Sequence, residues 1–200
     1  MRIILSILIS VAVFLVMNQV IPTKEECEIY NSTVRLHVLA NSDSESDQEL
    51  KLKVRDALLE EITTYEAKSK EEALYQMEQN KDELIEIARK TIRQNNENYD
   101  VSIEIGAEEY PTRYYEDFAL PAGNYTSVRV LIGEGEGQNW WCVLYPPLCT
   151  SAALEYNDES YIEVGLTKDQ YSLITGDSGR YKIKFKLLEL AEEAFGWNND

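Results

Sequence analysis

The segment from Ile3 to Ile21 contains no charged residue, and no other feature of the sequence constrains the fold as strongly. Nineteen residues at about 1.5 Å each form a helix of roughly 28 Å, close to the thickness of the hydrocarbon core of a bilayer. Only Ser6, Ser10, Asn18 and Gln19 interrupt the apolar run, so the helix has almost no polar face. The segment therefore predicts membrane insertion, in preference to a buried helix of a cytosolic protein.

The charges around this segment predict its orientation. Arg2 precedes it, and all 36 acidic residues follow it. A positive residue before an apolar helix keeps the N-terminus in the cytoplasm, so we expect the rest of the chain to be exported. No small-x-small pair occurs between Asn18 and Pro22. The sequence leaves open whether residues 1–21 are a removed signal peptide or a retained membrane anchor.

The composition excludes several classes of function. The net charge of −17 makes the chain a poor ligand for nucleic acid or anionic lipid. A hydrophobic content of 44% is enough for a packed core. One histidine and three cysteines are too few for a zinc-finger framework, and we expect neither a metal nor a cofactor.

The hydrophobic pattern after the first segment predicts one exported domain. Residues 22–32 are polar and are expected to be a tether, followed by a single domain over residues 33–200. Alternating or β-rich stretches predict strands, and apolar residues at helical spacing predict helices. The expected strands are residues 34–40, 101–105, 127–132 and 140–145, and the expected helices are residues 46–65 and 69–92, a short one from Thr167, and one from Leu187 onward. The order predicts an α+β fold, with helices packed on one face of a mostly antiparallel sheet.

Local signals refine these boundaries. Ser46 with Glu49, and Ser69 with Glu72, have the spacing of capping boxes that begin helices. A kink is expected in the second helix near Asn80. Glycines at alternate positions from Gly133 to Gly137 predict a flexible hairpin loop between the last two strands.

Two further patterns resemble ligand-binding loops but lack the residues that such loops need. The glycine run has no lysine and places Glu134 and Glu136 where a phosphate would lie. The acidic run from Asp43 to Asp47 resembles a calcium loop, yet Gln48 and Val54 replace its glycine and its bidentate glutamate. We therefore interpret the first as a turn and the second as the acidic start of a helix.

A nucleophile and a base can be proposed for catalysis. His37, the only histidine, could act as base for Cys142, with Asn41 or Asp43 orienting the imidazole. The alternative is a structural histidine and a buried thiol, because a cysteine within a strand is more often buried than reactive. The sequence does not give the distance between His37 and Cys142.

The cysteines also permit a disulfide. Cys142 and Cys149 flank Pro146-Pro147, which can turn the chain back on itself. Disulfides persist outside the cytoplasm, so we expect these two cysteines to be paired and Cys27 to be free.

Two aromatic patches are candidates for binding a partner, because aromatic side chains and arginine concentrate binding energy. Neighbouring residues of a strand point to opposite faces, so at most one of Trp140 and Trp141 can lie wholly in the core. Arg35 and His37 share one face of the first expected strand. The full set of candidate contact residues is Arg35, His37, Asn41, Asp43, Tyr110, Arg113, Tyr115, Trp140, Trp141 and Tyr145.

Several blocks of the sequence are distinctive, namely RLHVLANSDS (35–44) with residues 47–56, YPTRYY (110–115), LPAGNY (120–125), NWWCVLYPPLC (139–149) and residues 182–189. These blocks resemble those of the stage II sporulation protein R family. The resemblance extends over residues 33–190, in the family's order, and the tryptophan–cysteine block is the most specific part. Residues 151–180 match no block of the family.

The resemblance implies a signalling function in endospore-forming bacteria. Members are made in the forespore and exported toward the space between forespore and mother cell. There they are thought to activate a membrane-bound aspartic protease, which processes the precursor of the early mother-cell sigma factor. This implies a binding protein without catalysis, and the alternative from the residues is an exported hydrolase using Cys142 and His37.

Overall fold

The computed structural model describes residues 4–7, 10, 24–115, 118–148 and 166–175, which fall into two compact units. The larger unit comprises Tyr30–Tyr110 and Gly123–Thr167, and the smaller comprises Met1–Ile29, Pro111–Ala122 and Lys168–Asp200. Among the described residues no helix is long and apolar enough to cross a membrane. Most of the apolar segment from Ile3 to Ile21 lies outside this part of the chain.

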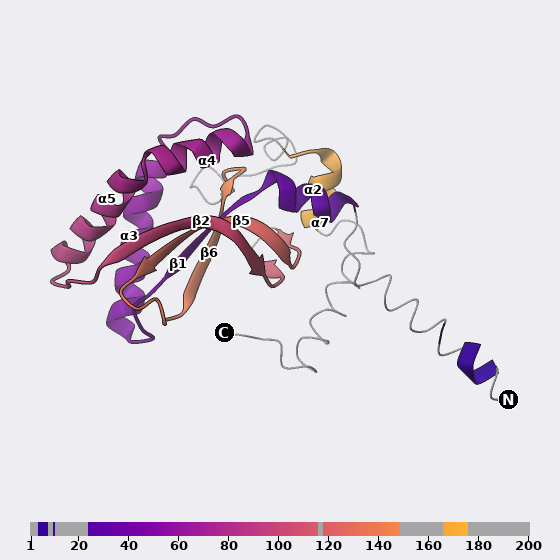
Figure 1. The fold of residues 1–200 in the computed structure, drawn as a ribbon, viewed down its shortest axis with the longest axis horizontal. Helices are drawn as coiled ribbons and strands as arrows, with labels where there is room; N and C mark the ends of the chain where they lie inside the picture. The colour runs from indigo at the N-terminus through magenta and orange to yellow at the C-terminus, as the bar shows by residue number, and fades with distance from the viewer. Residues whose placement is uncertain (1–3, 8–9, 11–23, 116–117, 149–165, 176–200) are drawn as a thin grey trace. The chain divides into compact units, whose positions relative to one another are not determined.

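A mixed four-stranded sheet forms the centre of the larger unit (Figure 1). The central strands β1 and β5 are parallel, and each pairs with an antiparallel edge strand. Two of the three pairings in this sheet are antiparallel, as expected for a mostly antiparallel sheet, but the sheet is mixed because its two central strands are parallel. The strands are β1 (Val34–Leu39), β2 (Val101–Tyr110), β5 (Gly123–Ile132) and β6 (Asn139–Tyr145), in the order β2-β5-β1-β6.

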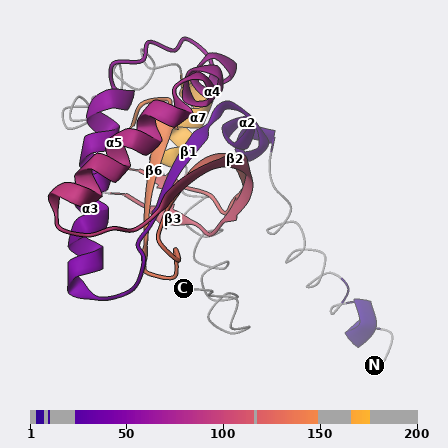
Figure 2. The same ribbon diagram turned by 60° about the vertical axis from the view of Figure 1, so that its left-hand side comes forward.

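Three helices pack on one face of this sheet (Figures 1 and 2), as the sequence predicts for an α+β fold. They are α3 (Glu45–Ile62), α4 (Lys70–Gln79) and α5 (Lys81–Gln94). Their apolar side chains meet every second residue of the strands in one buried cluster. The buried residues of the cluster are Val34, Leu36, Val38, Leu50, Val54, Leu58, Met77, Leu84, Ala88, Ile92, Val101, Ile103, Val128, Val130, Ile132 and Cys142.

The N-terminal caps of α3 and α4 show which of the serines in the sequence begin helices. Ser44, not Ser46, caps α3, and its hydroxyl accepts a hydrogen bond from the backbone N–H of Asp47 at 3.2 Å. Ser69 caps α4 as predicted, accepting from the N–H of Glu72 at 3.1 Å. Such a cap stabilises a helix by about 1 kcal/mol. At Asn80 the chain ends α4 and begins α5, instead of kinking one helix.

The glycine loop between β5 and β6 is not a hairpin, because β1 lies between these strands. The loop crosses the end of β1, where the N–H of Gly137 donates to the carbonyl of Ala40 at 3.0 Å. A Cβ on Gly137 would collide with the carbonyl of Ser42, so the crossing requires glycine here. Gly133 has φ +59°, a conformation that side chains rarely adopt.

Other elements are short. The smaller unit contains a two-stranded sheet, β3 (Arg113–Tyr114) with β4 (Ala119–Leu120), and α7 (Lys168–Ile174) confirms the helix expected from Thr167. Helix α2 (Lys24–Ser32) occupies most of the expected tether, with Glu26 and Ile29 only 1% exposed. The helix expected from Leu187 onward lies outside the described residues.

Candidate functional site

The two faces of β1 have different chemistry. Val34, Leu36 and Val38 point to the helices, whereas Arg35 and His37 point to the opposite side, here called the distal face. All six residues of β1 are buried, so both sides of this central strand are covered. Two charged or titratable side chains in a buried strand must find partners, because burial of an unpaired polar group is costly.

Arg35 is fully buried between two tyrosines. Its guanidinium carbon lies 4.2 Å from the ring centre of Tyr110 and 5.0 Å from that of Tyr125. Its Nε donates to the carbonyl oxygen of Cys142 at 3.2 Å. These cation–π contacts and the hydrogen bond bring β1, β2, β5 and β6 together around one side chain.

His37 is 3% exposed, and its nearest partners on the distal face are Glu108 and Trp141. Its Nδ1 lies 2.9 Å from Oε1 of Glu108. Its ring stacks on the indole of Trp141, with centroids 3.7 Å apart and an interplanar angle of 19°. The imidazole is thus held in one orientation by a carboxylate and an aromatic plane.

Glu108 is stabilised as an anion. Burial raises its pKa, but the hydrogen bond and charge interaction with His37, together with hydrogen bonds from Ser127 and Tyr110, outweigh this effect, so the pKa is lowered. Arg129 adds a positive charge, with Nε 3.5 Å from Glu108 Oε1 and Nη1 3.3 Å from Glu104 Oε2. Beside them the hydroxyl of Tyr110 lies 2.6 Å from Ser127 Oγ, and burial raises the pKa of Tyr110.

Together these side chains form what we call the distal cluster: Arg35, His37, Glu108, Tyr110, Tyr125, Ser127, Arg129 and Trp141. Four of them were predicted as contact residues, namely Arg35, His37, Tyr110 and Trp141. Glu108 and the three residues from β5 were missed. The sequence could have predicted Glu108, because side chains alternate along a strand and an extension of β2 beyond residue 105 places Glu108 on the same face as Tyr110.

Asn41 and Asp43 have a different role from the one proposed. Asn41 donates to Oδ2 of Asp47 at 2.9 Å and accepts from the N–H of Glu134 at 3.1 Å. Asp43 accepts from the N–H of Gln138 at 2.7 Å. Both side chains therefore join the start of α3 to the glycine loop, and neither contacts His37 in the described structure.

Asp47 is the centre of this junction. Ser42 Oγ donates to its carboxylate at 2.6 Å, in addition to Asn41. Burial raises the pKa of Asp47, but these hydrogen bonds, with further ones from Tyr99 and Ser44, outweigh burial and lower the pKa overall. Asp47, at the end of the acidic run from Asp43, is therefore hydrogen-bonded to neighbouring residues of the chain, which agrees with the interpretation of this run as the start of a helix.

The proposed couple of His37 and Cys142 is not assembled. In the register of β1 with β6, Cys142 lies opposite Leu36, and Trp141 lies opposite His37. Cys142 belongs to the buried cluster under the helices, while His37 stacks on the distal face. The sheet separates the two side chains, so the base cannot reach the thiol in this arrangement.

The two tryptophans point to opposite faces, as predicted, and both are half-buried. Trp140 packs beside the helices, with the guanidinium carbon of Arg55 4.8 Å from its ring centre. Tyr145 packs on the same side and lines a pocket described below. Of Trp140, Trp141 and Tyr145, only Trp141 belongs to the distal cluster.

Arg113 and Tyr115 belong to the smaller unit. Tyr115 stacks on Phe118, with ring centroids 4.5 Å apart and an interplanar angle of 18°.

Of the cysteines, Cys27 is free and exposed, as predicted. Cys142 is 2% exposed, and Cys149 lies outside the described residues, so their pairing stays a prediction.

Two comparisons with known proteins find the same family. The model of the stage II sporulation protein R family matches residues 30–155. Stage II sporulation protein R of Bacillus subtilis (strain 168) is 41% identical over 123 residues, which cover 60% of this chain and 55% of that protein. No solved structure matches the chain significantly.

Proposed function

Because the chain belongs to the stage II sporulation protein R family, we propose that it is an exported sporulation signal that activates a membrane-bound aspartic protease. The protease then processes the precursor of the early mother-cell sigma factor. The proposed location is the space between forespore and mother cell, reached across the cytoplasmic membrane by means of residues 3–21 as anchor or signal peptide.

The separation of His37 from Cys142 by the sheet is the observation that supports binding over hydrolysis most directly. The distal cluster is a buried set of stacked and hydrogen-bonded side chains, which is suited to holding the strands in one arrangement. The family is generally one of signalling proteins and not of enzymes. Activation then requires only that the ligand bind the active conformation of the protease more tightly than the inactive one.

The acidity of the chain supports the same proposal. A net charge of −17 favours a protein partner over nucleic acid or an anionic membrane surface. In the proposed order of events, this chain acts before the sigma factor is cleaved.

The test is co-expression of the chain, the protease and the sigma precursor in a host that lacks all three. We expect the precursor to be cleaved only when the chain and the protease are both present. The control is a protease variant without its catalytic aspartate, with which no cleavage should occur. Cleavage in that control would mean that the chain is itself a hydrolase, and no cleavage with the intact protease would contradict activation.

A further inference from the structure

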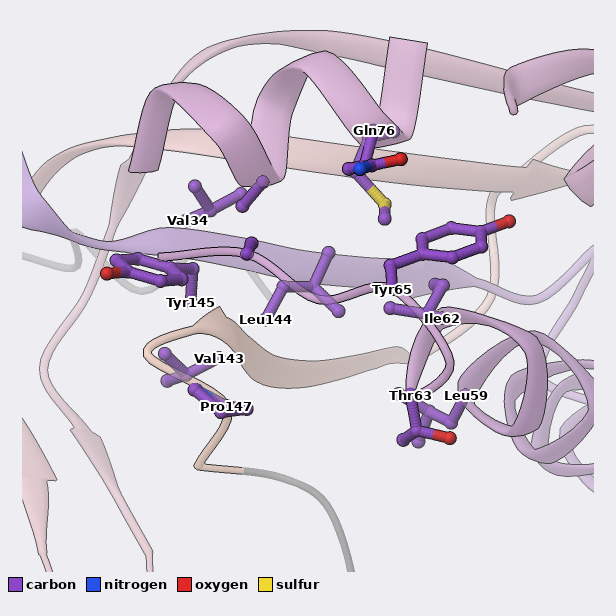
Figure 3. Close-up of a pocket in the computed structure, with 13 residues that line it drawn as sticks. Val34, Leu59, Ile62, Thr63, Tyr65, Gln76, Val143, Leu144, Tyr145 and Pro147 are labelled. Carbon is purple, nitrogen blue, oxygen red and sulfur yellow. The ribbon is translucent and has the colours of Figure 1, made fainter. Parts of the chain in front are cut away.

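A pocket of about 360 Å³ lies in the larger unit between the end of α3, α4 and β6 (Figure 3). Its volume falls in the range of roughly 300–1,000 Å³ that is typical of ligand pockets. Thr63 and Gln76 are its polar residues apart from two tyrosines. The remaining lining is apolar: Val34, Leu59, Ile62, Ala67, Ala73, Met77, Val143, Leu144 and Pro147.

The two tyrosines form opposite walls of this pocket. Figure 3 shows Tyr65 and Tyr145 on either side of Leu144, with their hydroxyl groups pointing away from each other. Leu144 lies between them, and most of the remaining lining is aliphatic. Such a surface binds an apolar group, and it offers few partners for the polar groups of a ligand.

Glutamates lie beside residues that line the pocket: Glu61 directly precedes Ile62, and Glu72 directly precedes Ala73. Burial, with Glu61 and Glu83, raises the pKa of Tyr65 to about 12. Burial, with Glu71 and Glu72, raises the pKa of Tyr145. In the part of the chain that the structure describes, none of these four glutamates forms an ion pair.

Lys70 offsets only part of this negative charge, because its charge interaction is with Glu71. Lys70, next to Glu71 in α4, directs its ammonium to the carbonyl oxygen of Tyr30 at 3.4 Å. The pocket therefore combines an apolar interior with a negative rim, and this combination selects the chemistry of what can enter.

We propose that this pocket is the docking site for a segment of a partner protein that presents a large apolar side chain flanked by lysine or arginine. The apolar side chain would fill the space between Tyr65 and Tyr145, and the flanking cations would meet the glutamates of the rim. The inference rests on the proposed function, since it describes how a partner such as the activated protease is held.

Electrostatics disfavour the other occupants. A second copy of the chain would bring the same four glutamates and the same net charge of −17 to the contact. An anionic bilayer surface would be repelled for the same reason. A basic and apolar protein segment is attracted by both properties of the pocket.

The first experiment fills the pocket without removing any of its lining. Ala67 lies in the loop before α4 and lines the pocket, so Ala67→Phe adds a ring to the interior. The probe is a short fluorescent peptide with a central leucine flanked by lysines, titrated with the full-length chain in detergent. We expect Ala67→Phe to weaken binding about tenfold.

The matched control is Ala107→Phe, which adds the same ring at an exposed position of β2 outside the pocket. It should bind the peptide as the unmodified chain does. If Ala67→Phe lowers the melting temperature, Thr63→Trp replaces it, because Thr63 is exposed and lines the same pocket.

The second experiment tests the rim. Glu61→Gln with Glu83→Gln should weaken binding severalfold at low salt and reduce its salt dependence. Glu78→Gln, on the exposed surface of α4, is the control and should change neither. A peptide with glutamates in place of the flanking lysines should not bind.

Several results would overturn the proposal. One is equal peptide binding by the unmodified chain and by Ala67→Phe. Another is binding to phosphatidylglycerol vesicles that Ala67→Phe abolishes, since the ligand would then be lipid. A third is self-association that Ala67→Phe abolishes, since the occupant would then be a second copy.

The co-expression assay separates this inference from the proposed function. If the unmodified chain and Ala67→Phe both trigger cleavage of the sigma precursor, docking at the pocket is wrong while activation stands. If neither variant triggers cleavage but the peptide still binds in the pocket, the proposed function is wrong while the binding site stands.

Discussion

His37 and Cys142 lie on neighbouring strands but project from opposite faces of the sheet. His37 lies opposite Trp141 in the pairing of β1 with β6, and Cys142 lies one position further, opposite Leu36. A difference of one residue in a strand reverses the direction of the side chain. The only histidine of the chain therefore supports the packing of the distal cluster and is not placed to activate the thiol.

Replacement of His37 by alanine should act through stability. The change removes the stacking on Trp141 and leaves the Glu108 carboxylate without its hydrogen bond, which should cost about 1–3 kcal/mol of unfolding free energy. We expect signalling to fall in proportion and to recover when more protein is expressed. A folded His37→Ala variant that binds the protease fully and still fails to trigger cleavage would contradict the binding mechanism.

The stability contributed by Glu108 should depend on pH. A carboxyl group with a lowered folded pKa stabilises the protein above its ordinary pKa of 4.5, and the contribution is lost as pH falls through the folded value. Glu108→Gln should therefore destabilise the protein at neutral pH and lose this effect in acid. Denaturation by urea at several pH values measures it. Glu109→Gln, at an exposed neighbouring position, is the control and should show no such dependence.

The glycine crossing over β1 should tolerate no side chain. Gly137→Ala places a methyl group against the carbonyl of Ser42 and should destabilise the protein by more than about 1 kcal/mol. Gly106→Ala provides the comparison, because a Cβ there meets no atom within 4 Å. Thermal unfolding of both variants checks the prediction, and similar melting temperatures would argue against a tight crossing.

The pairing of Cys142 with Cys149 can be measured on exported protein. Native protein should show one reactive thiol, from the exposed Cys27. Cys142 is buried, so labelling of the native protein does not report on its pairing, and labelling must be repeated after denaturation without reductant. One labelled thiol then supports the disulfide, and three labelled thiols exclude it.

Local patterns predicted most elements because their causes are local. The alternation of side chains alone predicts a strand over Val34–Leu39. The start of α4 is predicted by Ser69 and Glu72, which are in contact within one helical turn. Ser46 failed as a cap because Ser44, Asp47 and the loop residue Asn41 form a competing set of hydrogen bonds. One partner in that set, the N–H of Glu134, is 93 residues away in the sequence.

The sequence by itself determined the α+β class, the alternation of β1, the opposite directions of Trp140 and Trp141, and the family. These follow from periodicity and from short blocks of residues, which are properties of neighbours in the chain. Only the tertiary structure decided that β1 separates β5 from β6, that His37 meets Glu108 and not Cys142, and that Tyr145 and Tyr65 line the same pocket. Strand order and register depend on which distant segments bury each other's surfaces, and no local pattern specifies that choice.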